Sequence, residues 1–131
     1  MLTSLAYLLA TAAILLIAAG LFFAADRRRH IPLMFAAFGC DMVGLVLVEI
    51  VIPMASGHRD PLTGLFKADG NTYWTYIHAA LATLTVVGYV LQIMSGRRLA
   101  RGERGVLLRH KKVARYFVIT RVLAYITMFV A

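Results

Sequence analysis

Four long apolar runs alternate with short polar or basic stretches along this 131-residue chain. They cover residues 2–25, 31–54, 73–95 and 113–131, and each is close to the ~20 residues that span a bilayer as a helix. Because an open chain satisfies its backbone hydrogen bonds in lipid only as helix, the pattern predicts four transmembrane helices. The composition is 61% hydrophobic and 15% charged, so we expect residues 1–131 to form a single all-α transmembrane domain.

Basic residues are distributed unequally between the polar stretches and predict the orientation. Positive charges concentrate in the loops 26–30 and 96–112, whereas the loop 55–72 has only Arg59 and Lys67. Cytoplasmic loops are enriched in Lys and Arg, so the two basic loops are expected inside and both termini outside. Joined this way, consecutive spans become antiparallel neighbours. The sequence therefore predicts an up-down four-helix bundle in a bacterial inner membrane.

The basic loops that set the orientation of the spans account for most of the formal net charge of +8. The basic residues are flanked by spans and lack interleaved aromatic side chains, which argues against nucleic-acid binding and for attraction to anionic lipid headgroups. The sequence contains no nucleophile with an adjacent base, no phosphate loop and no nucleotide fingerprint. No particular enzyme is predicted, and an enzymatic role stays open.

Two opposite charges lie within predicted spans at matching depth. At about 1.5 Å per residue, Asp41 lies roughly 15 Å and Arg121 roughly 12 Å from the inner ends of their spans. A charge at the bilayer centre costs about 2.5 to 3.5 kcal/mol, and an opposite charge on a neighbouring helix offsets this cost. The sequence therefore predicts an Asp41–Arg121 ion pair, either purely structural or as electrostatic support for a site.

A polar seam runs along one face of the third span. Its members recur at spacings of three and four residues, as one face of a helix requires: His78, Ala82, Thr85, Tyr89 and Gln92. Two interpretations stay open. The seam makes routine interhelical hydrogen bonds, or it belongs to a ligand site.

The metal hypothesis takes Glu49, His78, Asp41 and Met128 as ligands. By the same depth estimate, Glu49 and His78 come within side-chain reach of each other in the outer half of the bundle. Carboxylate, imidazole and thioether groups suit copper when a methionine takes part, and zinc or iron when it does not. The sequence has no tight ligand motif such as H-x-x-x-H.

The haem hypothesis takes His30 and His110 as cofactor-binding residues. They occupy equivalent inner ends of the second and fourth spans, and a bis-histidine haem needs two such side chains. Arg29, Arg109 and Lys111 beside them would supply cations for the haem propionates. Equally, both histidines fit the pattern of basic helix ends that face lipid headgroups.

Three segments carry a family resemblance over residues 27–131: RRRHIPLMFAAF, YIHAALATLTVVGYVLQ and RHKKVARYFVIT. The chain resembles small four-helix membrane proteins of unknown function whose relatives include the oxidase-assembly factor CtaM. His30, His78 and His110 fall on the histidine positions of that pattern. The resemblance implies a role beside haem–copper oxidases, in the maturation of their haem or copper centres.

These features together predict a small inner-membrane accessory protein of respiratory haem–copper oxidase biogenesis. It would bind haem or a transition-metal ion (copper, iron or zinc) through intramembrane histidine and carboxylate side chains. Its expected partners are the lipid bilayer, respiratory oxidase subunits or other membrane proteins, and further copies of itself. The alternatives are a structural small subunit of a larger energy-transducing complex, whose polar seam faces partner helices, and a proton relay through Glu49 and His78.

Overall fold

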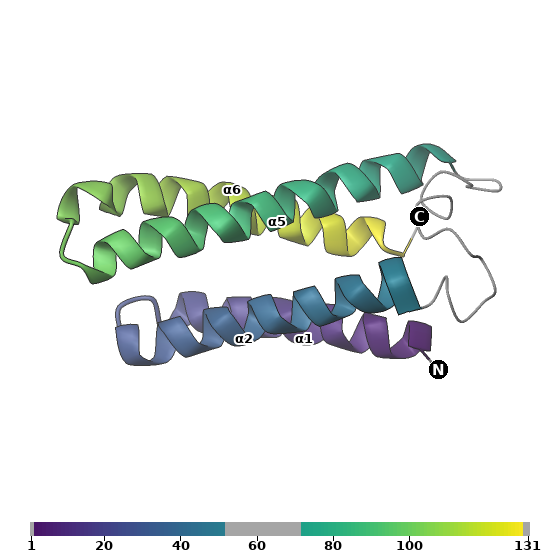
Figure 1. Ribbon diagram of the computed structural model, residues 1–131, viewed down its shortest axis with the longest axis horizontal. Helices are drawn as coiled ribbons and strands as arrows, with labels where there is room; N and C mark the ends of the chain where they lie inside the picture. The colour runs from purple at the N-terminus through teal and green to yellow at the C-terminus, as the bar shows by residue number, and fades with distance from the viewer. Residues whose placement is uncertain (1, 52–71, 130–131) are drawn as a thin grey trace. The chain divides into compact units, whose positions relative to one another are not determined.

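The computed structural model describes residues 2–51 and 72–129, which are helical apart from short turns. Four α-helices make up most of these ranges: α1 Leu2–Phe22, α2 Arg27–Val46, α5 Thr72–Ala100 and α6 Leu107–Thr127 (Figure 1). The described ranges contain no β-strand. The prediction of an all-α protein is confirmed.

The helices belong to two compact units, Met1–Gly70 and Asn71–Ala131, and each unit is described by itself. In the first, α1 packs against α2, and in the second, α5 packs against α6. Each pair runs antiparallel through a short turn (Figure 1). We call the pairs the first and second hairpin, and the end where the two helices are joined the turn end. The expected assembly of all four helices into one bundle stays a prediction.

Within the described ranges, three helices are long and apolar enough to cross a membrane. They are Ser4–Phe22, Arg27–Val46 and Tyr73–Ala100. Large apolar side chains remain exposed on them, including Leu8 and Met94. Such surface is unfavourable in water, whereas lipid tails solvate it. These features are those of a membrane protein.

The fourth expected span, 113–131, coincides with most of α6. The helix itself begins earlier, at Leu107, so its first two turns include the basic cluster that was expected in a loop. Since these charges lower the mean hydropathy of the helix, α6 is absent from the three apolar helices above. Residues 130–131 lie outside the described part of the chain.

The start of α2 also lies before the expected span. The helix begins at Arg27 because Asp26 caps it: the Asp26 carboxylate accepts a hydrogen bond from the backbone N–H of Arg28 at 3.0 Å. Pro32, expected at the start of the helix, is therefore its sixth residue. Proline has no N–H to donate to the carbonyl four residues earlier, so the first turns of α2 rely on the cap.

The connection between α5 and α6 is shorter than the expected loop 96–112. Both helices continue into that segment, which leaves residues 101–106 between Ala100 and Leu107. Part of this connection, Arg104–Val106, is itself a 3-10 turn. The second hairpin is therefore tightly closed at its turn end.

Gly102 ends α5 in the left-handed conformation, with φ +92°. The N–H of Glu103 donates to the carbonyl of Arg98 at 3.2 Å, and the N–H of Gly102 donates to that of Leu99 at 3.0 Å. These two bonds form a Schellman motif, in which glycine avoids the steric cost of positive φ. An ion pair between Arg98 and Glu103, with N···O 2.7 Å, spans the same turn.

Candidate functional site

His30 ties the start of α2 to the end of α1. Its Nδ1 lies 2.7 Å from the carbonyl oxygen of Gly20, and the ring is half-buried. A carbonyl oxygen only accepts hydrogen bonds, so Nδ1 donates and the neutral ring has its lone pair on Nε2. This is the form of histidine that ligates metal ions and haem iron.

His110 makes the corresponding contact in the second hairpin. Its Nδ1 lies 2.7 Å from the hydroxyl oxygen of Ser95 on α5. The same hydroxyl lies 2.7 Å from the carbonyl of Leu91, so its one proton serves either contact. The side chain of Gln92 also donates to the backbone carbonyl of His110, at 3.2 Å. His110 is therefore tied to α5 through both its ring and its backbone.

His78 lies at the opposite end of the second hairpin, near the start of α5. Its Nδ1 is 3.0 Å from the hydroxyl oxygen of Thr127 on α6. The same hydroxyl also lies 3.0 Å from the carbonyls of Leu123 and Ala124 of its own helix. Met128 follows Thr127 directly in the chain. Two of the four expected metal ligands, His78 and Met128, thus belong to one end of one hairpin.

The three described histidines therefore share one hydrogen-bond pattern. In each, Nδ1 lies within hydrogen-bond distance of a polar group on the partner helix of its own hairpin, and at His30, where that group is a carbonyl, Nδ1 donates. A second contact of this kind fixes the orientation of a histidine ring and raises its basicity, as is usual for metal-bound histidines. Sequence reasoning identified the histidines but missed their hydrogen-bond partners.

Polar residues occupy equivalent positions along α2 of the first hairpin and α6 of the second. His30 is the fourth residue of α2, and His110 is the fourth residue of α6. Eleven residues further along, Asp41 and Arg121 occupy equivalent positions with opposite charges. The two hairpins thus repeat one structural unit, in which an arginine followed by a histidine lies in the first turn of the second helix.

Neither Asp41 nor Arg121 is fully exposed. Arg121 is buried, with 6% of its surface exposed, and Asp41 is half-buried on α2. Because the two residues belong to the two units that are described separately, their ion pair stays a prediction.

Glu49 lies in a π-helical turn, Leu47–Val51, that continues α2. Its side chain is outside the part of the chain that the structure describes. Among the described residues, no three His, Cys, Asp or Glu side chains gather closely enough to hold a metal ion. The ligand set Glu49, His78, Asp41 and Met128 stays a prediction.

The polar seam of α5 faces α6. Thr85 and Tyr89 are buried, with 5% and 2% of their surfaces exposed, and His78 and Gln92 bond to α6 as described above. The hydroxyl of Thr85 donates to the carbonyl of Leu81 in its own helix at 2.9 Å. His78 and Gln92 therefore bond to α6, Thr85 bonds to its own helix, and Tyr89 packs on Phe117 of α6.

No protein-family model, curated protein or solved structure matches this chain. The relationship to the CtaM-related family stays a prediction that rests on the three sequence segments.

Proposed function

We propose that this protein is a multi-pass accessory protein of the bacterial inner membrane that binds haem or a transition-metal ion through intramembrane histidine and carboxylate side chains. Its role would be the biogenesis of respiratory haem–copper oxidases, with oxidase subunits as partners. One observation carries the proposal: Nδ1 of every described histidine lies 2.7 to 3.0 Å from a polar group on the partner helix of its own hairpin, the kind of contact that orients metal-bound histidines.

The donor chemistry fits haem best at the turn ends of the hairpins. A haem with two histidine ligands needs two axial nitrogens, and His30 and His110 each offer one. Arg29, Arg109 and Lys111 lie next to them in the chain and would pair with the propionates. When bound, the haem would supply redox chemistry or be the cargo that an oxidase receives.

A metal ion is the second candidate, and the ends of α5 and α6 away from the turn favour it. His78 is bonded to Thr127, and Met128 is the next residue along the chain. Imidazole nitrogen with thioether sulfur is a ligand combination that copper prefers. Asp41 and Glu49 would complete the proposed ligand set.

The proposed orientation places both turn ends in the cytoplasm and both termini outside. Its support is the charge at the turns: the first hairpin has Arg27, Arg28 and Arg29 there, and the second has several arginines between 97 and 104. Alkaline phosphatase fused to the C-terminus should be active, whereas a fusion placed after Arg101 should be inactive.

The deciding experiment is an absorption spectrum together with elemental analysis of the full-length protein, purified in a mild detergent. Haem should give a Soret band, and His30→Ala or His110→Ala should abolish or shift that band. His58→Ala is the matched control and should leave the band unchanged. A bound metal ion should instead appear in the elemental analysis and disappear in His78→Ala.

The absorption spectrum and the elemental analysis together distinguish bound haem from a bound metal ion. A Soret band that depends on His30 and His110 supports haem, and a stoichiometric metal that depends on His78 supports the metal ion. Protein that stays colourless and metal-free after expression with added haem precursor and copper would overturn the proposal. So would a ligand that survives all three single substitutions.

A further inference from the structure

The turn end of the first hairpin has a hollow on its surface, formed by the last turn after α1 and the first turns of α2. The hollow is lined by Phe23, Arg28, Arg29, Pro32, Leu33 and Ala36. Four of these side chains are apolar and two are arginines. Charge and apolar surface therefore meet in one depression.

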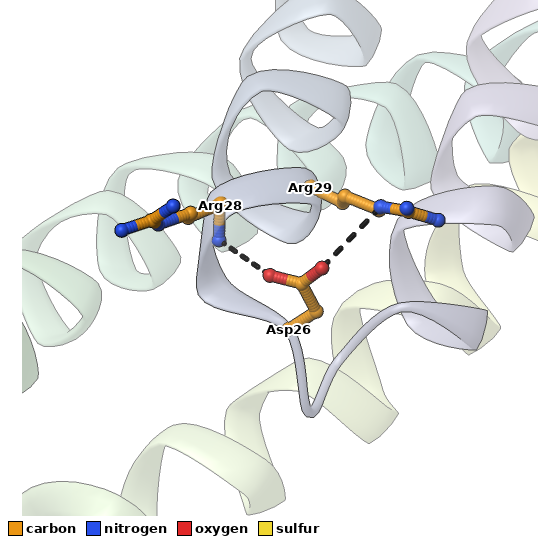
Figure 2. A network of polar contacts seen from close by, with 3 residues as sticks. All are labelled: Asp26, Arg28 and Arg29. Atoms are coloured by element: carbon orange, nitrogen blue, oxygen red, sulfur yellow. Dashed lines mark hydrogen bonds and ion pairs between the residues drawn. The ribbon is translucent and has the colours of Figure 1, made fainter.

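Arg29 is held at one side of this hollow. Its Nε lies 3.3 Å from the carboxylate of Asp26 (Figure 2). Its guanidinium carbon lies 5.0 Å from the centre of the Phe23 ring. The contact with the ring is a cation–π interaction. Both contacts restrict the side chain, so this positive charge has a defined place.

The side chain of Arg28 lies differently from that of Arg29. Its backbone N–H donates to Asp26, while Figure 2 shows its side chain pointing to the opposite side of the turn from that of Arg29. Within the part of the chain that the structure describes, the Arg28 guanidinium makes no ion pair and no hydrogen bond. An unpaired guanidinium has five N–H donors available for an anion.

The N-terminus of α2 does not provide the anion site, because Asp26 already accepts hydrogen bonds from its N–H groups. The Asp26 carboxylate accepts from the N–H of Arg28, and its carbonyl accepts from the N–H groups of Arg29 and His30 at 3.1 and 2.9 Å. With three arginines from 27 to 29 and one carboxylate, the turn keeps a net positive charge. Any anion here is recognised by side chains.

We propose that this hollow binds one anionic phospholipid of the leaflet in which the turn lies. Its phosphate contacts the guanidinium of Arg28, because guanidinium groups bind phosphate oxygens through charge-assisted hydrogen bonds. The first part of an acyl chain covers Phe23, Pro32, Leu33 and Ala36. Free phosphate would use the charge but leave this apolar floor in contact with water, which is why the occupant is a lipid. Because Arg28 has no role in the proposed haem or metal site, this inference does not depend on that site.

The test is native mass spectrometry of the full-length protein in non-ionic detergent, with added phosphatidylglycerol or with phosphatidylcholine of the same acyl chains. The parent should retain one phosphatidylglycerol and much less phosphatidylcholine. Arg28→Gln should weaken phosphatidylglycerol binding about tenfold, as expected for one lost charge-assisted contact. Arg101→Gln removes an exposed charge from the turn of the second hairpin and should change binding less than about twofold.

A second variant tests the apolar floor without changing charge. Ala36 is exposed, so Ala36→Phe should be tolerated and should fill the hollow, which weakens lipid retention. Equal losses in Arg28→Gln and Arg101→Gln would overturn the proposal, because they indicate diffuse attraction to the basic surface. Equal retention of the two lipids would also overturn it. Thermal stabilisation by sodium phosphate alone, as large as that by the lipid, would contradict a lipid site.

Discussion

Gly88 of α5 lies directly against the ring of Phe117 on α6. A Cβ atom added at Gly88 would lie 2.8 Å from Cδ2 and 3.3 Å from Cβ of Phe117. The same ring packs edge to face on Tyr89, with ring centroids 4.5 Å apart. The absence of a side chain at Gly88 thus lets a large aromatic ring fill the centre of the second hairpin, where lipid gives no hydrophobic driving force and close packing must stabilise the helix pair.

Gly88→Ala should destabilise the protein by about 1 to 3 kcal/mol, because the added methyl group must displace the Phe117 ring from its packing. The measurement is the unfolding free energy from SDS titration of the protein in mixed micelles. Gly39→Ala is the control: its Cβ would meet nothing within 4 Å, so the substitution should be neutral or stabilising. Adding Phe117→Leu to Gly88→Ala should recover part of the loss. If Gly88→Ala and Gly39→Ala unfold alike, the packing described here is wrong.

Thr127→Val should cost about 1 kcal/mol, because it removes the hydrogen bond between the Thr127 hydroxyl and Nδ1 of His78 across the hairpin. Thr120→Val is a matched control on the same helix. The hydroxyl of Thr120 donates only to carbonyls of α6 itself, those of Tyr116 and Phe117. Thermal unfolding of both variants should show a lower midpoint for Thr127→Val, and a larger effect at Thr120 would contradict the assigned role of Thr127.

Gly102→Ala should destabilise the second hairpin by roughly 1 to 2 kcal/mol, since an alanine at φ +92° is strained. Gly105→Ala, three residues along in the same connection, introduces a Cβ into open space and has no positive φ to accommodate. It should be nearly neutral. Protease sensitivity at the α5–α6 connection would report the difference, and equal cleavage of the two variants would argue against the Schellman turn.

Most of the fold could be predicted from apolar run length alone. The runs place helices correctly because hydrocarbon requires each span to satisfy its own backbone. Their ends were harder to predict, because helices continue past the apolar run wherever a cap or a turn permits. Asp26 extends α2 toward the turn, and Gly102 allows α5 to run through Arg97 and Arg98 before it ends.

The residues of the candidate site could be predicted from the sequence, but the arrangement and hydrogen-bond partners of their side chains could not. A titratable side chain within an apolar run is rare enough to identify His78 directly, and His30 and His110 are the histidines of the two basic loops. Their hydrogen-bond partners were not identifiable, because the carbonyl of Gly20 is a backbone group and Thr127 resembles any other threonine in a span. Which helix faces meet within a hairpin depends on side-chain packing, and the spacing of polar residues does not determine it.

The predicted Asp41–Arg121 pair can be tested by a double-mutant cycle. Arg121 is buried in the second hairpin, so if Asp41 is its partner, Arg121→Leu leaves a carboxylate unpaired and should cost about 3 to 5 kcal/mol. Asp41→Leu should have a comparable effect, whereas the double variant should be milder than the sum because no charge is left alone. The unfolding free energies of the four proteins in mixed micelles measure the coupling. Additive losses would mean that Asp41 and Arg121 are not partners and that each charge has a separate partner. Their equivalent positions in the two hairpins would then follow from the repeated structural unit alone.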